Sequence, residues 1–174
     1  MPTKLKLTAY HEAGHTVMAY CLHRRILHVS IIPEGDTLGH LQRGHGQNLE
    51  RIEVTYPRIR ASVEKKAMVS WGGNVAEYLL SRKKRRTVSE QDEMDVFYGL
   101  LDLSSSVEEA GAYSDWLWYR TKAMLQLSWH WAATQALAKE LYHHRYIGGK
   151  RVRQIIKESI RTFVPEEPTV DKQP

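Results

Sequence analysis

The stretch AYHEAGHTVMAY, residues 9–20, places two histidines four positions apart, with a glutamate directly after the first. Apolar residues recur every three or four positions around it and predict a helix over residues 4–24. On a helix, side chains at i and i+4 lie on the same face, so His11 and His15 can bind the same ion. Zinc accepts imidazole nitrogen, and a catalytic zinc site takes three protein ligands and a water. Glu12, turned by about 100° from His11, would stand beside the ion as a general base.

The composition is that of one globular domain. The chain has 174 residues, of which 42% are hydrophobic and 26% are charged; this length suffices for one core and is short for two. We expect a domain over residues 1–163 and a flexible tail over 164–174, which holds three prolines and no core-forming pattern. No apolar run approaches the roughly 20 residues of a membrane-spanning helix, and no secretory signal is visible.

The cysteine content and the charge indicate in which compartment the protein acts and which partners it binds. The single cysteine, Cys21, excludes an internal disulfide and fits a reducing compartment, so we expect a cytoplasmic protein. The formal net charge is +5, and the run RKKRR at residues 82–86 supplies much of it. Such a run is typical of the solvated end of a helix, and no aromatic residues alternate with it. We therefore do not expect a nucleic-acid partner.

The remaining pattern predicts a mainly α protein with a small β element, an α+β arrangement. Apolar periodicity of three to four marks the helices, and β-branched runs mark the strands. In chain order we expect a hairpin of strands at 26–33 and 38–43, a helix from Pro57 to the basic run, a helix beginning near Ser89, one long helix over 112–144, and a last amphipathic helix after a break at Gly148 and Gly149.

The third metal ligand is left open by the spacing. Residue 21, where a metzincin would carry a third histidine, is Cys21. The candidates are downstream carboxylates: Glu77, Asp92 and Asp95. Both aspartates would also suit the first turn of a helix, where negative charge complements the dipole. Glu77 could equally be solvated or pair with Arg82.

Gly14 stands inside the predicted helix, where glycine costs about 1 kcal/mol relative to alanine. Either a close approach to the backbone at the metal site or tight packing against a second helix would explain this cost.

Four segments together resemble the peptidase domain of the FtsH-type zinc metalloproteases. That family typically shows a HEAGH helix, a VSIIPRG strand followed by ALG, a GGRAAEE helix and a TGAxNDL helix start. The matching segments here span about half the chain: AYHEAGHTVMAY at 9–20, HVSIIPEGDTLGHLQ at 28–42, GGNVAEYLL at 72–80 and TVSEQDEMD at 87–95. The resemblance implies a helical metallopeptidase domain with a small β-hairpin or sheet bordering the active-site helix.

The resemblance also implies residue roles and a Zn²⁺ cofactor. His11 and His15 match the zinc-binding histidines, and Glu12 matches the catalytic base. Asp92 matches the aspartate that is the third zinc ligand in the family. Glu77 matches the first glutamate of GGRAAEE and would be a structural residue near the site.

The chain also departs from the family pattern. Family members usually carry an AAA ATPase module and membrane anchors, but no G-x-x-x-x-G-K-[ST] motif occurs in these 174 residues. We therefore expect an ATPase or unfoldase, where one is needed, to be a separate protein. The arginine of VSIIPRG is Glu34 here, and the arginine and second glutamate of GGRAAEE are Asn74 and Tyr78. These substitutions near the cleft leave the substrate preference open. Whether the protein forms a homo-oligomer is left open as well.

Two hypotheses follow. The first is a zinc-dependent endopeptidase that hydrolyses peptide bonds of polypeptide substrates with a metal-activated water. The alternative is a catalytically weak or inactive zinc-containing binding or adaptor module, which would retain zinc and co-purify with a partner.

Overall fold

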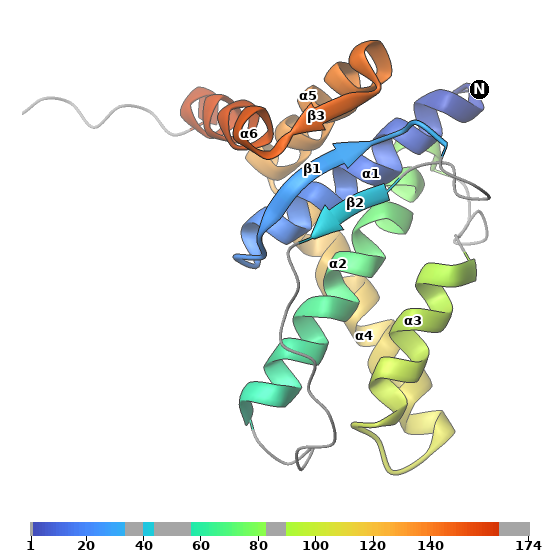
Figure 1. The fold of residues 1–174 in the computed structure, drawn as a ribbon. Helices are drawn as coiled ribbons and strands as arrows, with labels where there is room; N and C mark the ends of the chain where they lie inside the picture. The colour runs from blue at the N-terminus through green and yellow to red at the C-terminus, as the bar shows by residue number, and fades with distance from the viewer. Residues whose placement is uncertain (1, 34–39, 44–56, 83–89, 164–174) are drawn as a thin grey trace, which may run out of the picture.

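The structure is a computed structural model that describes residues 2–33, 40–43, 57–82 and 90–163. In this part of the chain, helices dominate and three short strands form one sheet (Figure 1). The predicted mainly α architecture with a small β element is confirmed. The elements are α1 (Lys4–Cys21), β1 (Ile26–Ser30), β2 (His40–Arg43), α2 (Pro57–Ser81), α3 (Glu90–Leu101), α4 (Val107–Leu125), α5 (Ser128–His144), β3 (Tyr146–Gly148) and α6 (Gly149–Phe163).

Helix α1 is the central element. The hydroxyl of Thr3 caps its start by accepting a hydrogen bond from the Lys6 N–H. Helix α1 contacts α2, α5 and strand β1, so residues 12–19 are all buried rather than one stripe alone. Figure 1 shows it running behind the sheet and across α2. The predicted helix over 4–24 is confirmed, although it ends at Cys21 and His23 adopts a left-handed φ of 57°.

The sheet has the order β2-β1-β3, and β1 is antiparallel to both neighbours. The predicted hairpin is confirmed by β1 and β2, while residues 38–39 of its second strand lie outside the described part. The expected break before the last helix is present, but it holds strand β3, which the sequence did not predict; Gly148 of β3 pairs with His28. Gly149 then begins α6, and a Cβ there would overlap the carbonyl oxygen of Ile26. The glycine therefore serves a close approach to β1.

The predicted single helix over 112–144 is wrong, because α4 ends at Leu125 and α5 begins at Ser128. The ring of His130 contacts both α4 and α1 at this junction. Its Nδ1 contacts the carbonyl oxygen of Met124 at the end of α4, and its Nε2 lies 3.4 Å from the thiol of Cys21 on α1. The junction between α4 and α5 thus contacts α1, a part of the chain 109 positions away, and the local sequence does not reveal this contact.

Helix α4 also starts five residues earlier than predicted. The Ser106 hydroxyl accepts from the Glu109 N–H, and the Glu109 carboxylate accepts from the Ser105 N–H. This arrangement is a variant of the capping box, in which a serine and a glutamate three positions later satisfy the free amides of the first turn. The sequence Ser106-x-x-Glu109 carried that signal.

The core lies where α1, α2, α4 and α5 meet. Trp71 of α2 is fully buried, and its ring meets that of Trp118 edge-on at a centroid distance of 5.1 Å. Trp116, two positions before Trp118, is 49% exposed because it points to the opposite side of α4. The largest fully buried side chains are those of Trp71, Met18, Leu100, Leu117, Leu125, Leu137, Leu141 and Ile156, with several valines.

The expected flexible tail at 164–174, Ser89 and residues 83–86 of the basic run lie outside the described residues. Among the helices that the structure does describe, none has both the length and the apolar character needed to cross a membrane.

Candidate metal centre

Three predicted ligand residues from two helices meet at one point. His11 and His15 lie one turn apart on α1, and Asp92 comes from the first turn of α3. Nε2 of His11 lies 2.9 Å from Nε2 of His15 and 3.1 Å from Oδ2 of Asp92, and His15 Nε2 lies 3.5 Å from the same oxygen. The two rings are nearly perpendicular, at 85°.

This donor set fits a zinc ion. Two imidazole nitrogens and one carboxylate oxygen are ordinary protein ligands of catalytic zinc. Ligand atoms at about 2.0–2.1 Å from zinc and at tetrahedral angles stand roughly 3.3–3.4 Å from one another, and the three observed separations lie around that value. The structure thus brings together the residues predicted to bind metal.

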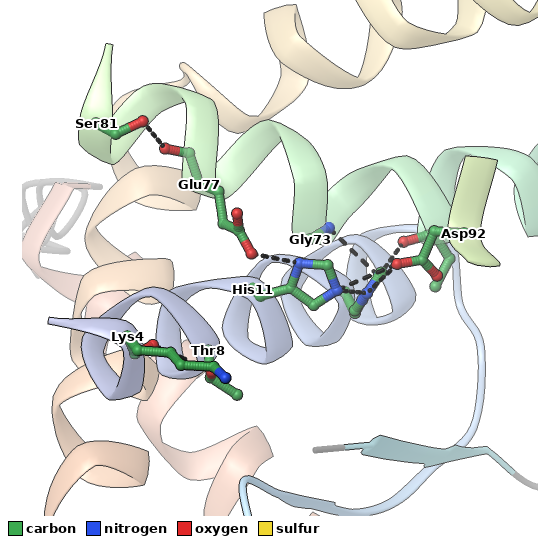
Figure 2. A network of polar contacts seen from close by, with 9 residues as sticks. Lys4, Thr8, His11, Gly73, Glu77, Ser81 and Asp92 are labelled. Carbon is green, nitrogen blue, oxygen red and sulfur yellow. Dashed lines mark hydrogen bonds and ion pairs between the residues drawn. The ribbon is translucent and has the colours of Figure 1, made fainter. Parts of the chain in front are cut away.

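The other ring nitrogen of each histidine lies against an oxygen of α2. Nδ1 of His15 lies 2.7 Å from the carbonyl oxygen of Val69 on α2. Nδ1 of His11 lies 2.9 Å from the Glu77 carboxylate, and Figure 2 shows the two side chains facing each other. The Gly73 N–H is 3.3 Å from Nδ1 of His15, a longer contact, and Nδ1 cannot donate and accept at once. With the protons on Nδ1, both Nε2 atoms keep a lone pair for a metal.

Electrostatics at the site favour charged groups. Burial alone would lower the pKa of His11, but hydrogen bonds to Asp92 and Glu77 outweigh it and raise the pKa to about 10. Burial would likewise raise the pKa of Asp92, yet the charges and hydrogen bonds of His15 and His11 hold it well below its usual range. In the metal-free protein, the extra proton on His11 therefore balances the negative charge of Asp92 and Glu77.

Glu12 lies beside this cluster. It follows His11 on α1, and only 5% of its surface is exposed. It does not belong to the convergent group of His11, His15 and Asp92. The role of Glu12 as a general base beside the metal stays a prediction.

The other candidates for third ligand are accounted for. Asp95 accepts a hydrogen bond from Gln91 and lies on the exposed side of α3. Glu77 contacts His11 rather than Arg82, as a structural residue near the site would. Cys21 lies at the far end of α1 and contacts His130.

Glycines bring α1 and α2 into direct backbone contact. A Cβ on Gly14 would overlap the carbonyl oxygen of Gly72, and one on Gly72 would lie 2.7 Å from the carbonyl oxygen of Gly14. Helix packing, not a ligand, therefore explains Gly14. A Cβ on Gly73 would lie 2.5 Å from Nε2 of His15, so Gly73 leaves room for the imidazoles. Sequence reasoning missed Gly73 and Val69, although the Gly72-Gly73 pair inside a helix was a visible signal.

Comparison with known proteins agrees with this geometry. The family described as "Peptidase family M41" matches residues 2–96. The chain is 34% identical over 91 residues to the ATP-dependent zinc metalloprotease YME1L1 of Rattus norvegicus, a match over 51% of this chain and 12% of that protein. It is 42% identical over 76 residues to the ATP-dependent zinc metalloprotease FtsH of Pelobacter propionicus, over 42% of this chain and 11% of the relative.

The chain thus spans only about an eighth of the length of these relatives. The matched region contains α1, the sheet strands β1 and β2, α2 and the start of α3, which together carry all four predicted site residues. Because that match covers more than half of the chain and contains the site, the protein belongs to peptidase family M41 and carries a zinc-metalloprotease-like domain.

Proposed function

We propose that this protein is a zinc-dependent endopeptidase that hydrolyses peptide bonds in polypeptide substrates. One observation carries the proposal: Nε2 of His11, Nε2 of His15 and Oδ2 of Asp92 converge beside the buried Glu12. The separation of Asp92 from His11 by 81 positions makes this convergence a product of the fold. The M41 match supports the same reaction.

In this proposal His11, His15 and Asp92 hold the metal. A zinc ion bound there would supply Lewis-acid activation of water and of the scissile carbonyl. The Glu12 carboxylate accepts the proton that the attacking water loses and passes it to the leaving amine nitrogen. Its burial limits competing contacts with solvent, which strengthens the electrostatic interactions within the site.

The substrate would enter as an extended chain. Strand β2 lies at the edge of the described sheet and contacts α1, so an extended peptide could add to that edge by main-chain hydrogen bonds. Such binding requires a locally unfolded substrate. We therefore propose that folded substrates need a separate ATPase partner, and that the protein acts in a reducing compartment such as the cytoplasm, as its single cysteine suggests.

The test compares the wild type with Glu12→Gln, using a permanently unfolded protein as substrate. Glutamine keeps the shape of the side chain but cannot accept the proton, so we expect equal zinc content and a loss of cleavage by about 100-fold or more. Zinc is measured by elemental analysis, and cleavage by gel and mass spectrometry. If the zinc-loaded wild type cleaves nothing that the variant spares, the endopeptidase proposal is wrong and the binding-module alternative gains support.

A further inference from the structure

A second hollow lies away from the metal centre, where the ends of α2 and α4 meet the start of α5. Its volume is about 470 Å³, within the range of small-molecule sites. None of His11, Glu12, His15 and Asp92 lines it. The described lining residues are Tyr78, Leu79, Arg82, Lys122, Gln126 and Trp131.

The charge in this hollow is positive. Arg82 and Lys122 supply two cations, and no carboxylate is present among the described lining residues. In the described part of the chain, neither cation forms an ion pair; the Lys122 amine instead lies 4.7 Å from the centre of the Tyr78 ring. Neighbouring cations attract anions, and an arginine binds phosphate or carboxylate oxygens through a planar fork of donors.

Two aromatic rings supply the walls, and both are held by neighbours. The Trp131 ring lies 5.9 Å from that of Tyr10 on α1, centre to centre. The Tyr78 ring contacts that of Trp118 at 6.1 Å, close to perpendicular. Because neither ring must be ordered on binding, a planar ligand ring could stack or pack against them at little entropic cost.

Arg82 is fixed at the end of α2. Its N–H donates to the carbonyl oxygen of Tyr78, and its φ of 51° lies in the left-handed region, which residues other than glycine rarely adopt. Helix α2 therefore ends directly before Arg82, which lines the hollow.

We propose that this hollow binds a small anion attached to a planar ring, with Arg82 and Lys122 on the anionic group and Trp131 and Tyr78 against the ring. An aryl phosphate and a mononucleotide share this chemistry. Gln126 offers an amide that could hydrogen-bond to either ligand. This site is independent of peptide hydrolysis, so its test does not depend on the proposed function.

The experiment measures binding of phenyl phosphate and of adenosine monophosphate to the full chain by calorimetry and by ligand-observed NMR. We expect one site at millimolar or tighter affinity that weakens as salt is added. Lys122→Gln and Arg82→Gln should each weaken binding about tenfold, since each removes a charge-assisted contact. Lys139→Gln, an exposed lysine elsewhere on α5, is the matched control and should bind as the wild type does.

The contribution of the ring is tested separately. Trp131→Leu should weaken the binding of phenyl phosphate about fivefold or more, while inorganic phosphate should bind weakly to the wild type and to the variant.

Binding of phenyl phosphate alone or of adenosine monophosphate alone supports the proposal and identifies which class of ligand the hollow accepts. Absence of binding by both, equal affinity for inorganic phosphate, or unchanged affinity in Lys122→Gln and Arg82→Gln would overturn it. Thermal unfolding checks that each variant is folded, and the two charge variants replace exposed or half-buried side chains.

Discussion

Nδ1 of His11 lies 2.9 Å from a carboxylate oxygen of Glu77, while Nε2 of the same ring lies 3.1 Å from Oδ2 of Asp92. The two carboxylates, one on α2 and one on α3, thus hold the imidazole from opposite sides (Figure 2). Such a partner fixes the tautomer and orientation of a metal-binding histidine and makes its free nitrogen more basic. The relationship gives Glu77 a positioning role.

Glu77→Gln should weaken zinc binding by about tenfold, at the lower end of the range for such partners. The amide can still accept from Nδ1 but carries no charge to raise the basicity of the ring. The measurement is competition with a chromophoric zinc chelator. Asp95→Asn, on the exposed side of α3, is the control and should leave the affinity unchanged. Wild-type affinity in Glu77→Gln would show that the contact does not support the metal.

Zinc uptake should release protons near pH 7. In the metal-free protein the pKa of His11 is raised to about 10 by the hydrogen bonds of Asp92 and Glu77 against the cost of burial, so the ring is protonated. Zinc requires the neutral ring. Calorimetry in two buffers of different ionisation enthalpy measures the release. A binding enthalpy that is the same in both buffers would contradict the raised pKa.

The same shift affects the stability of the metal-free protein. Because the folded pKa of His11 is raised above its unfolded value of 6.5, its contribution is fully present below pH 6.5 and is lost as the pH rises toward about 10. Urea unfolding of chelator-treated protein across this range should show the decline. His11→Gln should flatten it, and an equal decline in that variant would assign the effect to other groups.

Gly14→Ala should lower the free energy of unfolding by about 3 kcal/mol, at the upper end for overpacking. The added methyl group would overlap backbone atoms of Gly72, which cannot move without separating α1 from α2. Gly111→Ala in α4 is the matched control, because a Cβ there meets nothing within 4 Å. It should stabilise the protein by about 0.5–1 kcal/mol through helix propensity. Equal effects of the two substitutions in urea unfolding would refute the packing argument.

The thiol of Cys21 should react slowly. Burial raises its pKa from 9.0 to about 11, so at pH 8 the thiolate fraction falls roughly 100-fold. Reaction with Ellman's reagent should be slow at pH 8, accelerate toward pH 11, and become fast in guanidinium chloride. A folded-state rate at pH 8 equal to that of the unfolded chain would contradict this environment.

Much of the fold was predictable because periodicity is local. The spacing around Val17 and Met18 predicted α1, and the β-branched run at residues 26–33 predicted β1. Strand β3 was missed because three residues carry no period. The break between α4 and α5 was not predicted because neither glycine nor proline marks it in the sequence. In the structure, His130 near this break contacts Cys21, which is 109 positions away and cannot be inferred from the local pattern.

The sequence by itself determined half of the candidate metal centre. The i, i+4 spacing placed His11 and His15 on one face of a helix, and adjacency placed Glu12 beside them, since both follow from helix geometry. Spacing could not select among Glu77, Asp92 and Asp95; resemblance to a family favoured Asp92. Only the tertiary structure brings Asp92 to the histidines and Glu77 next to His11, because both depend on how α1, α2 and α3 pack, and Gly14 and Gly72 allow the close approach of α1 and α2.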